Sequence, residues 1–301
     1  MTRNNLFKAV ISAMLAVCVI STVFVGCKTA NDNEKDKSGN SSPSAITGEI
    51  NVISREEGSG TRDAFTELMG IVDENDVDNT VETAEITSST SVMITTVKGN
   101  PRAIGYISLG SLSEDVKAVS LDGTVPSVET VKDGSYKLQR PFVIAYKDGK
   151  LSDVSQDFVS FIMSKTGQTI IEEEGYIGVD AEADYKASNL SGTVTISGST
   201  SVAPVMEVLA DKYKELNPNV QIEIQQPGSG AGIEAAIQDT VEIAMSSREL
   251  KDDESKTLTP VQIALDGIAV IVNNENSIDN LTTQQIKSIF TGETASWEEI
   301  K

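Results

Sequence analysis

The sequence of 301 residues contains no histidine. This absence excludes a histidine-ligated metal site, a Ser-His-Asp triad and a histidine general base. Aromatic residues make up only 5% of the chain, yet apolar residues reach 39% and recur in short periodic runs. Such a composition is typical of a folded body rather than of a disordered chain, and the length allows two lobes with a substantial core.

Cysteine is almost absent as well, because only Cys18 and Cys27 occur. Cys18 lies in an uncharged N-terminal stretch of 17 residues, 9–25, that two basic residues precede. A transmembrane helix is the alternative, but the stretch is short for one, and we predict an export signal over 1–26. Residues 24–27 (FVGC) resemble the lipobox of bacterial lipoproteins. We therefore expect a lipid on Cys27, on the extracytoplasmic face of a Gram-positive type of cell membrane, and a mature chain without a disulfide.

Positive charge is scarce, and the formal net charge is −21. So acidic a chain argues against binding to nucleic acid or to anionic lipid, which leaves the lipid anchor as the expected membrane contact. Any anion that binds here has to be captured by local geometry rather than by bulk attraction.

The chain divides into a polar tether and a folded body. Residues 27–47, with the anchor at their start, are polar and lack apolar periodicity, so we predict a flexible linker. From Gly48 onward short strands and helices alternate, with a strand expected at 268–272, which predicts an α/β fold with parallel sheets covered on both faces. The polar segment 180–192 is predicted to be a linker or surface loop.

Three predicted strand-to-helix junctions share one chemistry. Residues 58–61 (GSGT), 198–201 (GSTS) and 228–230 (GSG) each combine glycine, hydroxyl side chains and the start of a helix. Glycine allows close approach of the backbone to a ligand, and unpaired amide groups at a helix N-terminus favour anions. Arg55 precedes the first junction. Together they predict a site for a small tetrahedral anion.

The simpler reading of each feature stays open. A single Ser/Thr/Gly turn is more often only a helix cap, and Arg55 has a surface ion pair with Glu56 or Glu57 as its alternative. The sequence contains no Walker A motif and no G-x-S-x-G elbow, and no clear carboxylate cluster suited to a metal. We therefore expect a binding protein and not an enzyme, with no cofactor and no metal.

Longer runs carry a resemblance to a known family, the PstS phosphate-binding proteins of bacterial ABC importers. The matching runs are ISREEGSGTRDAF (53–65), AIGYISLGSL (103–112), ISGSTSVAP (196–204), PGSGAGI (227–233), MSSREL (245–250), ALDGIAVIVN (264–273) and IFTGETASW (289–297). The resemblance implies a type II periplasmic-binding-protein fold with two α/β lobes and a hinge. It also implies a monomeric, lipid-anchored receptor that binds inorganic phosphate between its lobes and delivers it to the transmembrane subunits of an ABC permease.

The resemblance also implies a set of site residues. The residues expected to contact phosphate are Arg55, Ser59, Gly60, Thr61, Thr200, Ser201, Ser229 and Ser247, with Glu57 orienting Arg55. Some members carry an aromatic residue in place of Ser201, which would leave only a backbone contact there. We expect Arg248 to be an ion-paired surface group, or else a second cation at the mouth of the site.

Ser247 keeps other ligands open. Some members of the family carry an aspartate there, which accepts a proton from the ligand and helps to reject sulfate, whereas a serine hydroxyl either donates or accepts. A receptor for sulfate or molybdate is therefore the alternative on the same scaffold. A further alternative is a surface lipoprotein or sensor that keeps the fold without transport.

The order of the matching runs is unusual. In the family the run at 196–204 usually comes first and the run at 53–65 follows, but here the order is reversed. We predict a circular permutation, with the old ends joined through about 180–192. Lobe two then comprises 48–115 and 272–301, and lobe one comprises 116–271. A piece of a tandem duplication is the alternative.

Overall fold

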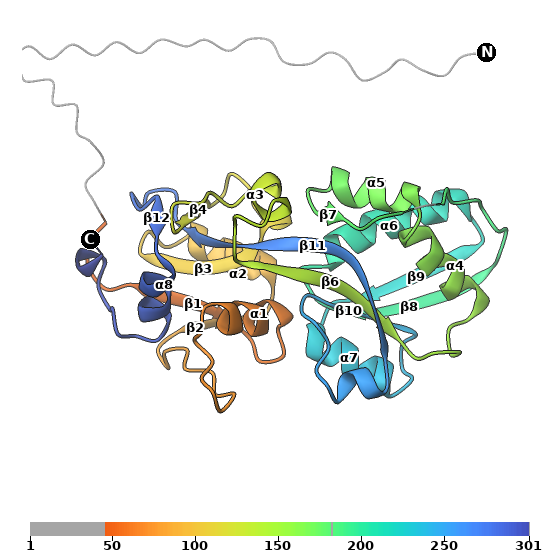
Figure 1. Ribbon diagram of the computed structural model, residues 1–301, viewed down its shortest axis with the longest axis horizontal. Coiled ribbons are helices and arrows are strands. Elements are labelled where there is room, and N and C mark those ends of the chain that lie inside the picture. Colours follow the sequence, from red (N-terminus) through yellow and green to blue (C-terminus); the bar gives the residue numbers. More distant parts are fainter. Residues whose placement is uncertain (1–45, 182, 301) are drawn as a thin grey trace, which may run out of the picture. The chain divides into compact units, whose positions relative to one another are not determined.

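The computed structural model describes residues 46–181 and 183–300 (Figure 1). The predicted export signal, the lipidation site Cys27 and most of the predicted tether lie outside the described residues. Within the described ranges, no helix has both the length and the apolar character needed to span a membrane.

Strands and helices alternate along the described chain, as the sequence predicts. The strands are β1 (Asn51–Arg55), β2 (Glu85–Thr87), β3 (Ala103–Ser108), β4 (Lys117–Ala118), β5 (Ser120–Leu121), β6 (Gln139–Tyr146), β7 (Ile177–Gly178), β8 (Gly192–Gly198), β9 (Val220–Gln225), β10 (Ile243–Ser246), β11 (Thr259–Val272) and β12 (Asn280–Leu281). The α-helices are α1 (Gly60–Leu68), α2 (Thr90–Lys98), α3 (Val128–Lys132), α4 (Asp153–Ile162), α5 (Lys165–Glu173), α6 (Ala203–Leu216), α7 (Ser229–Ile237) and α8 (Thr283–Phe290).

One long strand links two groups of parallel strands. The main sheet has the order β2-β1-β3-β11-β6-β10-β8-β9, in which β1 to β3 pair in parallel, as do β8 to β10. Between these groups, β11 pairs antiparallel with β6 through its first half and with β3 through its second half. The prediction of parallel sheets is therefore confirmed for the two groups and wrong for β6 and β11, which cross between them (Figure 1).

The side chains form a separate core on each side of this crossing. We call lobe one the part around Phe158, Phe161 and Tyr213, and lobe two the part around Phe65, Tyr106 and Phe290. In lobe two the rings of Phe65 and Tyr106 stack with centroids 4.0 Å apart. Strand β11 contributes to both lobes. Its residues 263 and 264 pack in the core of lobe one, and 268, 270 and 272 pack in the core of lobe two.

The packing moves one predicted boundary. Val119, Val131 and Leu138 are buried in the core of lobe two, and β4 and β5 pair with β11 and β12. The segment 116–138 therefore packs with lobe two, although the sequence places it in lobe one. The boundary between the lobes thus lies at β6 rather than at residue 116. Periodicity in the sequence indicates that such residues are buried, but not against which sheet they pack.

The first and last described segments lie side by side (Figure 1). Glu49 forms an antiparallel β-bridge with Ser296, and the amide of Trp297 donates to the carbonyl of Gly48 at 3.1 Å. The indole of Trp297 also donates to the carbonyl of Arg102 at 3.0 Å. Both ends of the described chain thus belong to one edge of lobe two.

Candidate anion-binding site

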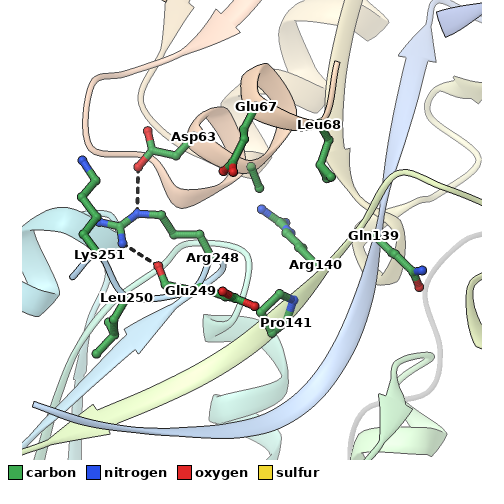
Figure 2. A pocket seen from close by; sticks show the side chains of 11 residues that line it. Asp63, Glu67, Leu68, Gln139, Arg140, Pro141, Arg248, Glu249, Leu250 and Lys251 are labelled. Atoms are coloured by element: carbon green, nitrogen blue, oxygen red, sulfur yellow. Dashed lines mark hydrogen bonds and ion pairs between the residues drawn. The ribbon is translucent and has the colours of Figure 1, made fainter. Parts of the chain in front are cut away.

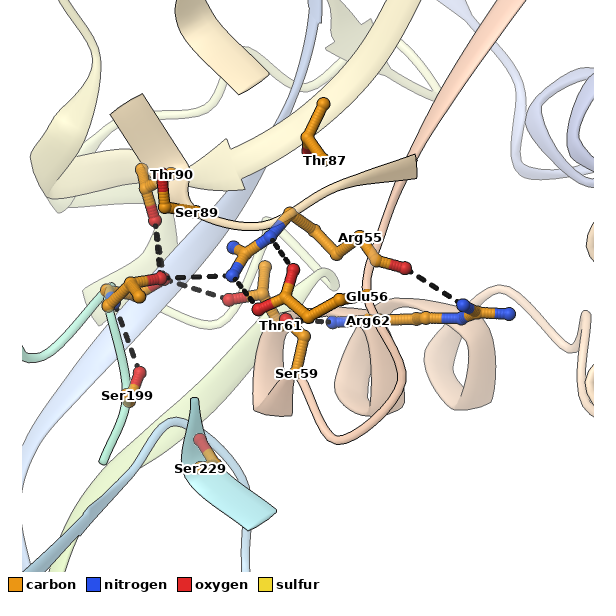
Figure 3. A network of polar contacts seen from close by, with 12 residues as sticks. Arg55, Glu56, Ser59, Thr61, Arg62, Thr87, Ser89, Thr90, Ser199 and Ser229 are labelled. Carbon is orange, nitrogen blue, oxygen red and sulfur yellow. Dashed lines mark hydrogen bonds and ion pairs between the residues drawn. The ribbon is translucent and has the colours of Figure 1, made fainter. Parts of the chain in front are cut away.

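The three predicted junctions meet where the two lobes face each other. Residues 58–59 lead into α1 of lobe two, whereas 198–202 and Gly228 lead into α6 and α7 of lobe one. The amide of Gly230 donates to the carbonyl of Gly58 at 2.9 Å, and the amide of Gly228 donates to the carbonyl of Gly198 at 3.0 Å. Helix N-termini from both lobes are therefore brought to one place, shown in part in Figure 3.

Arg55 ends strand β1 and is 2% exposed. Its Nη2 donates to Thr200 Oγ1 at 3.0 Å, and its Nε and Nη2 donate to the carboxylate of Glu56 at 2.8 and 2.7 Å. The structure thus corrects the prediction that Glu57 orients Arg55. The chain turns after Arg55, so Glu56 reaches the guanidinium while Glu57 lies exposed in the turn. Arg55 therefore has the ion pair that the surface alternative predicted, but its own side chain is buried.

Buried hydroxyl groups from both lobes lie at these junctions. Thr61 Oγ1 lies 2.8 Å from Ser201 Oγ, across the interface. Within lobe one, Ser247 Oγ accepts a hydrogen bond from Ser199 Oγ at 3.0 Å, and the amide of Ser247 donates to Ser229 Oγ at 3.2 Å. All of these hydroxyls are buried. Such a set of short donors beside a guanidinium suits a tetrahedral oxyanion.

The two lobes approach each other closely at Gly60. A Cβ atom at this position would lie 2.4 Å from Ser229 Oγ and 2.8 Å from Ser247 Oγ, so no side chain fits. Ser59 differs from the other predicted residues, because its hydroxyl accepts from the amide of Arg62 at 3.4 Å and caps α1. The predicted residues thus converge, with Ser59 turned toward its own helix.

Sequence reasoning missed Thr90, the first residue of α2. Its Oγ1 lies 3.3 Å from Thr200 Oγ1 and 3.2 Å from Ser201 Oγ. Thr90 is labelled in Figure 3. A Ser-Thr pair at a helix start is the sequence signal here, and it lacks the glycine that the three predicted junctions share. Ser199, which caps the turn after β8 by accepting from the amides of Ser201 and Val202, was also missed as a partner of Ser247.

The end of β1 is held by Tyr106 and by Arg62. The hydroxyl of Tyr106 lies 2.9 Å from Ser54 Oγ and accepts from the amide of Arg55 at 3.2 Å. Burial raises the pKa of Tyr106 to about 12, so the phenol keeps its proton at neutral pH. Arg62 donates to the carbonyl of Arg55 at 2.8 Å and pairs with Asp78 at 2.7 Å. These contacts fix the backbone from which Arg55 projects.

Arg248 is ion-paired, as predicted, but it is buried rather than on the surface. Its Nε donates to Asp63 of lobe two at 2.8 Å (Figure 2). Its other nitrogens donate to Glu254 of lobe one at 2.8 Å. The surface prediction failed because Asp63, distant in sequence, covers the guanidinium from the other lobe.

The domain model of the PBP superfamily matches residues 15–166 and 183–300 of this chain. Phosphate-binding protein PstS 2 of Streptococcus agalactiae is 49% identical over 266 residues, which cover 87% of this chain and 91% of that protein. The chain belongs to the PstS phosphate-binding protein family. Its two α/β lobes are those of the periplasmic-binding-protein fold.

A solved structure agrees with this assignment to PstS. The crystal structure of a phosphate-binding protein of a phosphate ABC transporter from Streptococcus pneumoniae superposes with a TM-score of 0.69 at 48% identity, covering 84% of this chain and 100% of that one. By contrast, phosphate-binding protein PstS of Bacillus subtilis is 33% identical over 123 residues, which cover 40% of this chain and 40% of that protein. Similarity to that PstS protein thus extends over less than half of either sequence.

Proposed function

We propose that this chain is an extracytoplasmic receptor that binds inorganic phosphate between its two lobes and delivers it to the permease of an ABC importer. The observation that carries the proposal is the contact of the buried Arg55 of lobe two with Thr200 of lobe one, whose hydroxyl also lies 3.3 Å from that of Thr90. Membership of the PstS family supports phosphate as the ligand.

The proposed binding step exchanges these contacts for contacts to the ligand. Arg55 Nη2 turns its hydrogen bond from Thr200 to a phosphate oxygen, while Glu56 keeps the guanidinium in place. The hydroxyls of Thr61, Ser201 and Ser229 donate to the remaining oxygens, and Gly60 offers the N-terminus of α1. A charge-assisted bond together with several short neutral donors favours a doubly charged oxyanion.

Ser247 bears on which oxyanion is preferred. Its hydroxyl lies among Ser199 and Ser229, all uncharged, and either donates or accepts. An uncharged group at this place does not repel sulfate as a carboxylate would. Sulfate and molybdate therefore stay as the second candidate ligands.

Binding is tested by calorimetric titration of the full chain in detergent with phosphate, sulfate and molybdate in turn. We expect phosphate to bind most tightly at a single site. A folded sample that binds no phosphate contradicts the proposal, and tighter binding of sulfate at neutral pH favours the second candidate. If Arg55→Ala leaves phosphate uptake by cells unchanged, the chain acts as a sensor or surface lipoprotein instead.

We also propose that lipid on Cys27 holds the receptor at the outer face of the membrane. The lipobox-like residues 24–27 support this proposal. The Cys27→Ala variant is expected to leave the membrane fraction and to appear in the culture medium. A variant that stays membrane-bound would contradict the anchor.

We further propose that the lobes are joined in circularly permuted order. The bridge between Glu49 and Ser296 supports it, because the proposed cut requires these segments to be neighbours. The proposed joint is packed on lobe one, where Tyr185 and Ser188 donate to the carboxylate of Asp157 at 2.5 and 2.8 Å. The match to the protein of Bacillus subtilis covers only 40% of this chain, as expected if the two proteins have their halves in different order. The match to the protein of Streptococcus agalactiae covers 87%, as expected if both have the same order.

A further inference from the structure

We propose that Arg248 and Asp63 form a latch between the lobes that slows the release of phosphate from the closed receptor. The proposal rests on the proposed function, because it concerns the same closure of the lobes. Neither residue belongs to the predicted phosphate contacts, so the latch acts by holding the lobes together and not by touching the ligand.

The geometry divides the guanidinium of Arg248 between the two lobes. Its Nη1 and Nη2 donate to the two carboxylate oxygens of Glu254 at 2.8 Å each, and Nη1 also donates to the carbonyl of Glu249 at 2.7 Å. These three bonds stay within lobe one and fix the side chain in one orientation. The remaining Nε donates to Asp63 Oδ2 of lobe two at 2.8 Å. Of the bonds that Arg248 makes, separation of the lobes thus breaks only this last one, and the guanidinium stays in place for the next closure.

The bond between Arg248 and Asp63 lies beside a cavity and not within a tightly packed part of the interface. It borders a cavity of about 420 Å³ that is lined by α1, β6 and residues 248–251 (Figure 2). The side chain of Arg248 is 9% exposed and that of Asp63 is 31% exposed, so the pair is only partly screened by water. Loss of the bond is therefore not masked by neighbouring packing.

The charge of Asp63 gives the latch a second effect on anion binding. Asp63 lies in the first turn of α1, whose N-terminal residues Gly60 and Thr61 face the candidate site. A carboxylate there competes with a bound anion for the positive end of the helix dipole and repels it. When the lobes close, Arg248 neutralises this carboxylate. Closure therefore removes a repulsion at the same moment as it adds a bond.

The test compares phosphate binding by the full chain in detergent with that of Asp63→Asn, Arg248→Gln and the double variant. The matched control is Lys147→Gln, which removes a 2.7 Å ion pair with Asp239 inside lobe one. We expect each single variant to raise the phosphate dissociation rate about threefold to tenfold, with a much smaller change in the association rate. The double variant should equal the worse single variant, since both remove the same ion pair. The control should release phosphate at the wild-type rate.

Asp63→Asn is the decisive variant, because it leaves the bonds of Arg248 within lobe one untouched. If it and Arg248→Gln release phosphate at the wild-type rate, or if their effects simply add, the latch is wrong while the proposed function stands. If the wild type binds no phosphate, the proposed function fails, and X-ray scattering decides on the latch. An unchanged radius of gyration in Asp63→Asn then overturns it, and a larger one supports it.

Discussion

Arg55 donates a hydrogen bond of 3.0 Å to Thr200, a residue 145 positions further along the chain and in the other lobe. Arg55 enters this contact already paired with Glu56, so a neutral ion pair rather than a bare cation faces the hydroxyl groups. A protein with a net charge of −21 repels anions at long range. The contact shows how local geometry in such a chain still presents a fork of donors to an anion.

Replacement of Arg55 by lysine should abolish tight phosphate binding. Lysine keeps the charge but lacks the planar fork that reaches Glu56 and Thr200 together. We expect the phosphate dissociation constant to rise on the order of 100-fold, as for other truncated buried charge pairs. Calorimetric titration measures this, with Lys98→Met, an exposed residue paired with Asp115, as the control. A dissociation constant close to that of the wild type in a folded variant would contradict the role of Arg55.

Gly60→Ala should separate folding from binding. The added methyl group would lie 2.4 Å from Ser229 Oγ, and this contact exists only between the lobes. Alanine is a better helix former than glycine, so lobe two should fold at least as stably as before. We expect an unchanged melting temperature without phosphate and a loss of phosphate affinity of at least about tenfold, as the clash opposes closure. The control is Gly99→Ala, whose Cβ would meet its nearest atom at 3.4 Å. Tight binding by Gly60→Ala would show that the lobes need not approach this closely.

The buried pair of Arg140 and Asp266 predicts a pH effect on stability. The two residues face each other on β6 and β11, with Nη2 and Oδ2 3.2 Å apart, and both are almost fully buried. Burial outweighs the nearby guanidinium and raises the pKa of Asp266 to about 6. The folded chain therefore holds this proton more tightly than the unfolded chain, in which an aspartate titrates near about pH 4. The stability that Asp266 contributes is complete below about pH 4 and is lost as the pH rises through about 6.

Urea unfolding of the wild type and of Asp266→Asn between pH 4 and pH 7 tests this effect. The difference in unfolding free energy, wild type minus variant, should fall as the pH rises from about 4 to 6, because the asparagine does not titrate. Taking the difference cancels the contribution of carboxylates with the opposite pH dependence, such as Glu254. Burial opposes ionisation of Glu254, but its bonds to Arg248 and to the amide of Lys251 together lower its pKa. A difference that rises with pH would mean that the attraction of Arg140 outweighs burial and lowers the pKa of Asp266.

Much of the fold could be predicted from the sequence, because strands and amphipathic helices have distinct apolar periods. The alternation of strands and helices expected from Gly48 onward is present, from β1 to α8. The strand predicted at 268–272 is only the end of β11, whose first half begins at Thr259. Residues 259–262 of that half alternate between half-buried and exposed, and 263–264 are both buried. No local pattern indicates that a strand continues from one lobe into another.

The candidate site was predictable where glycine, hydroxyl and helix start coincide, as at 198–201. What the sequence could not decide was pairing between neighbours and across lobes. Glu56 and Glu57 are chemically equal, and only the turn after Arg55 selects Glu56. Thr90 and Asp63 acquire their roles from residues more than 100 positions away, Ser201 and Arg248. Such partners follow from the closure of the lobes and not from any local signal.

Joining the ends of the folded body tests the permuted order most directly. The amide of Trp297 already donates to the carbonyl of Gly48, so a short glycine-serine linker can join residue 300 to residue 48 without strain. New ends are then placed inside 180–192, in the predicted joint. We expect this chain to fold with a melting temperature within about 10 °C of the parent, since only loop connections change. It should also bind phosphate with a dissociation constant within about tenfold of the parent value.

The matched control places the new ends between Ser59 and Gly60, at the start of α1, where we expect binding to be lost. Failure of the first chain to fold, in contrast to the parent, would count against a permuted origin.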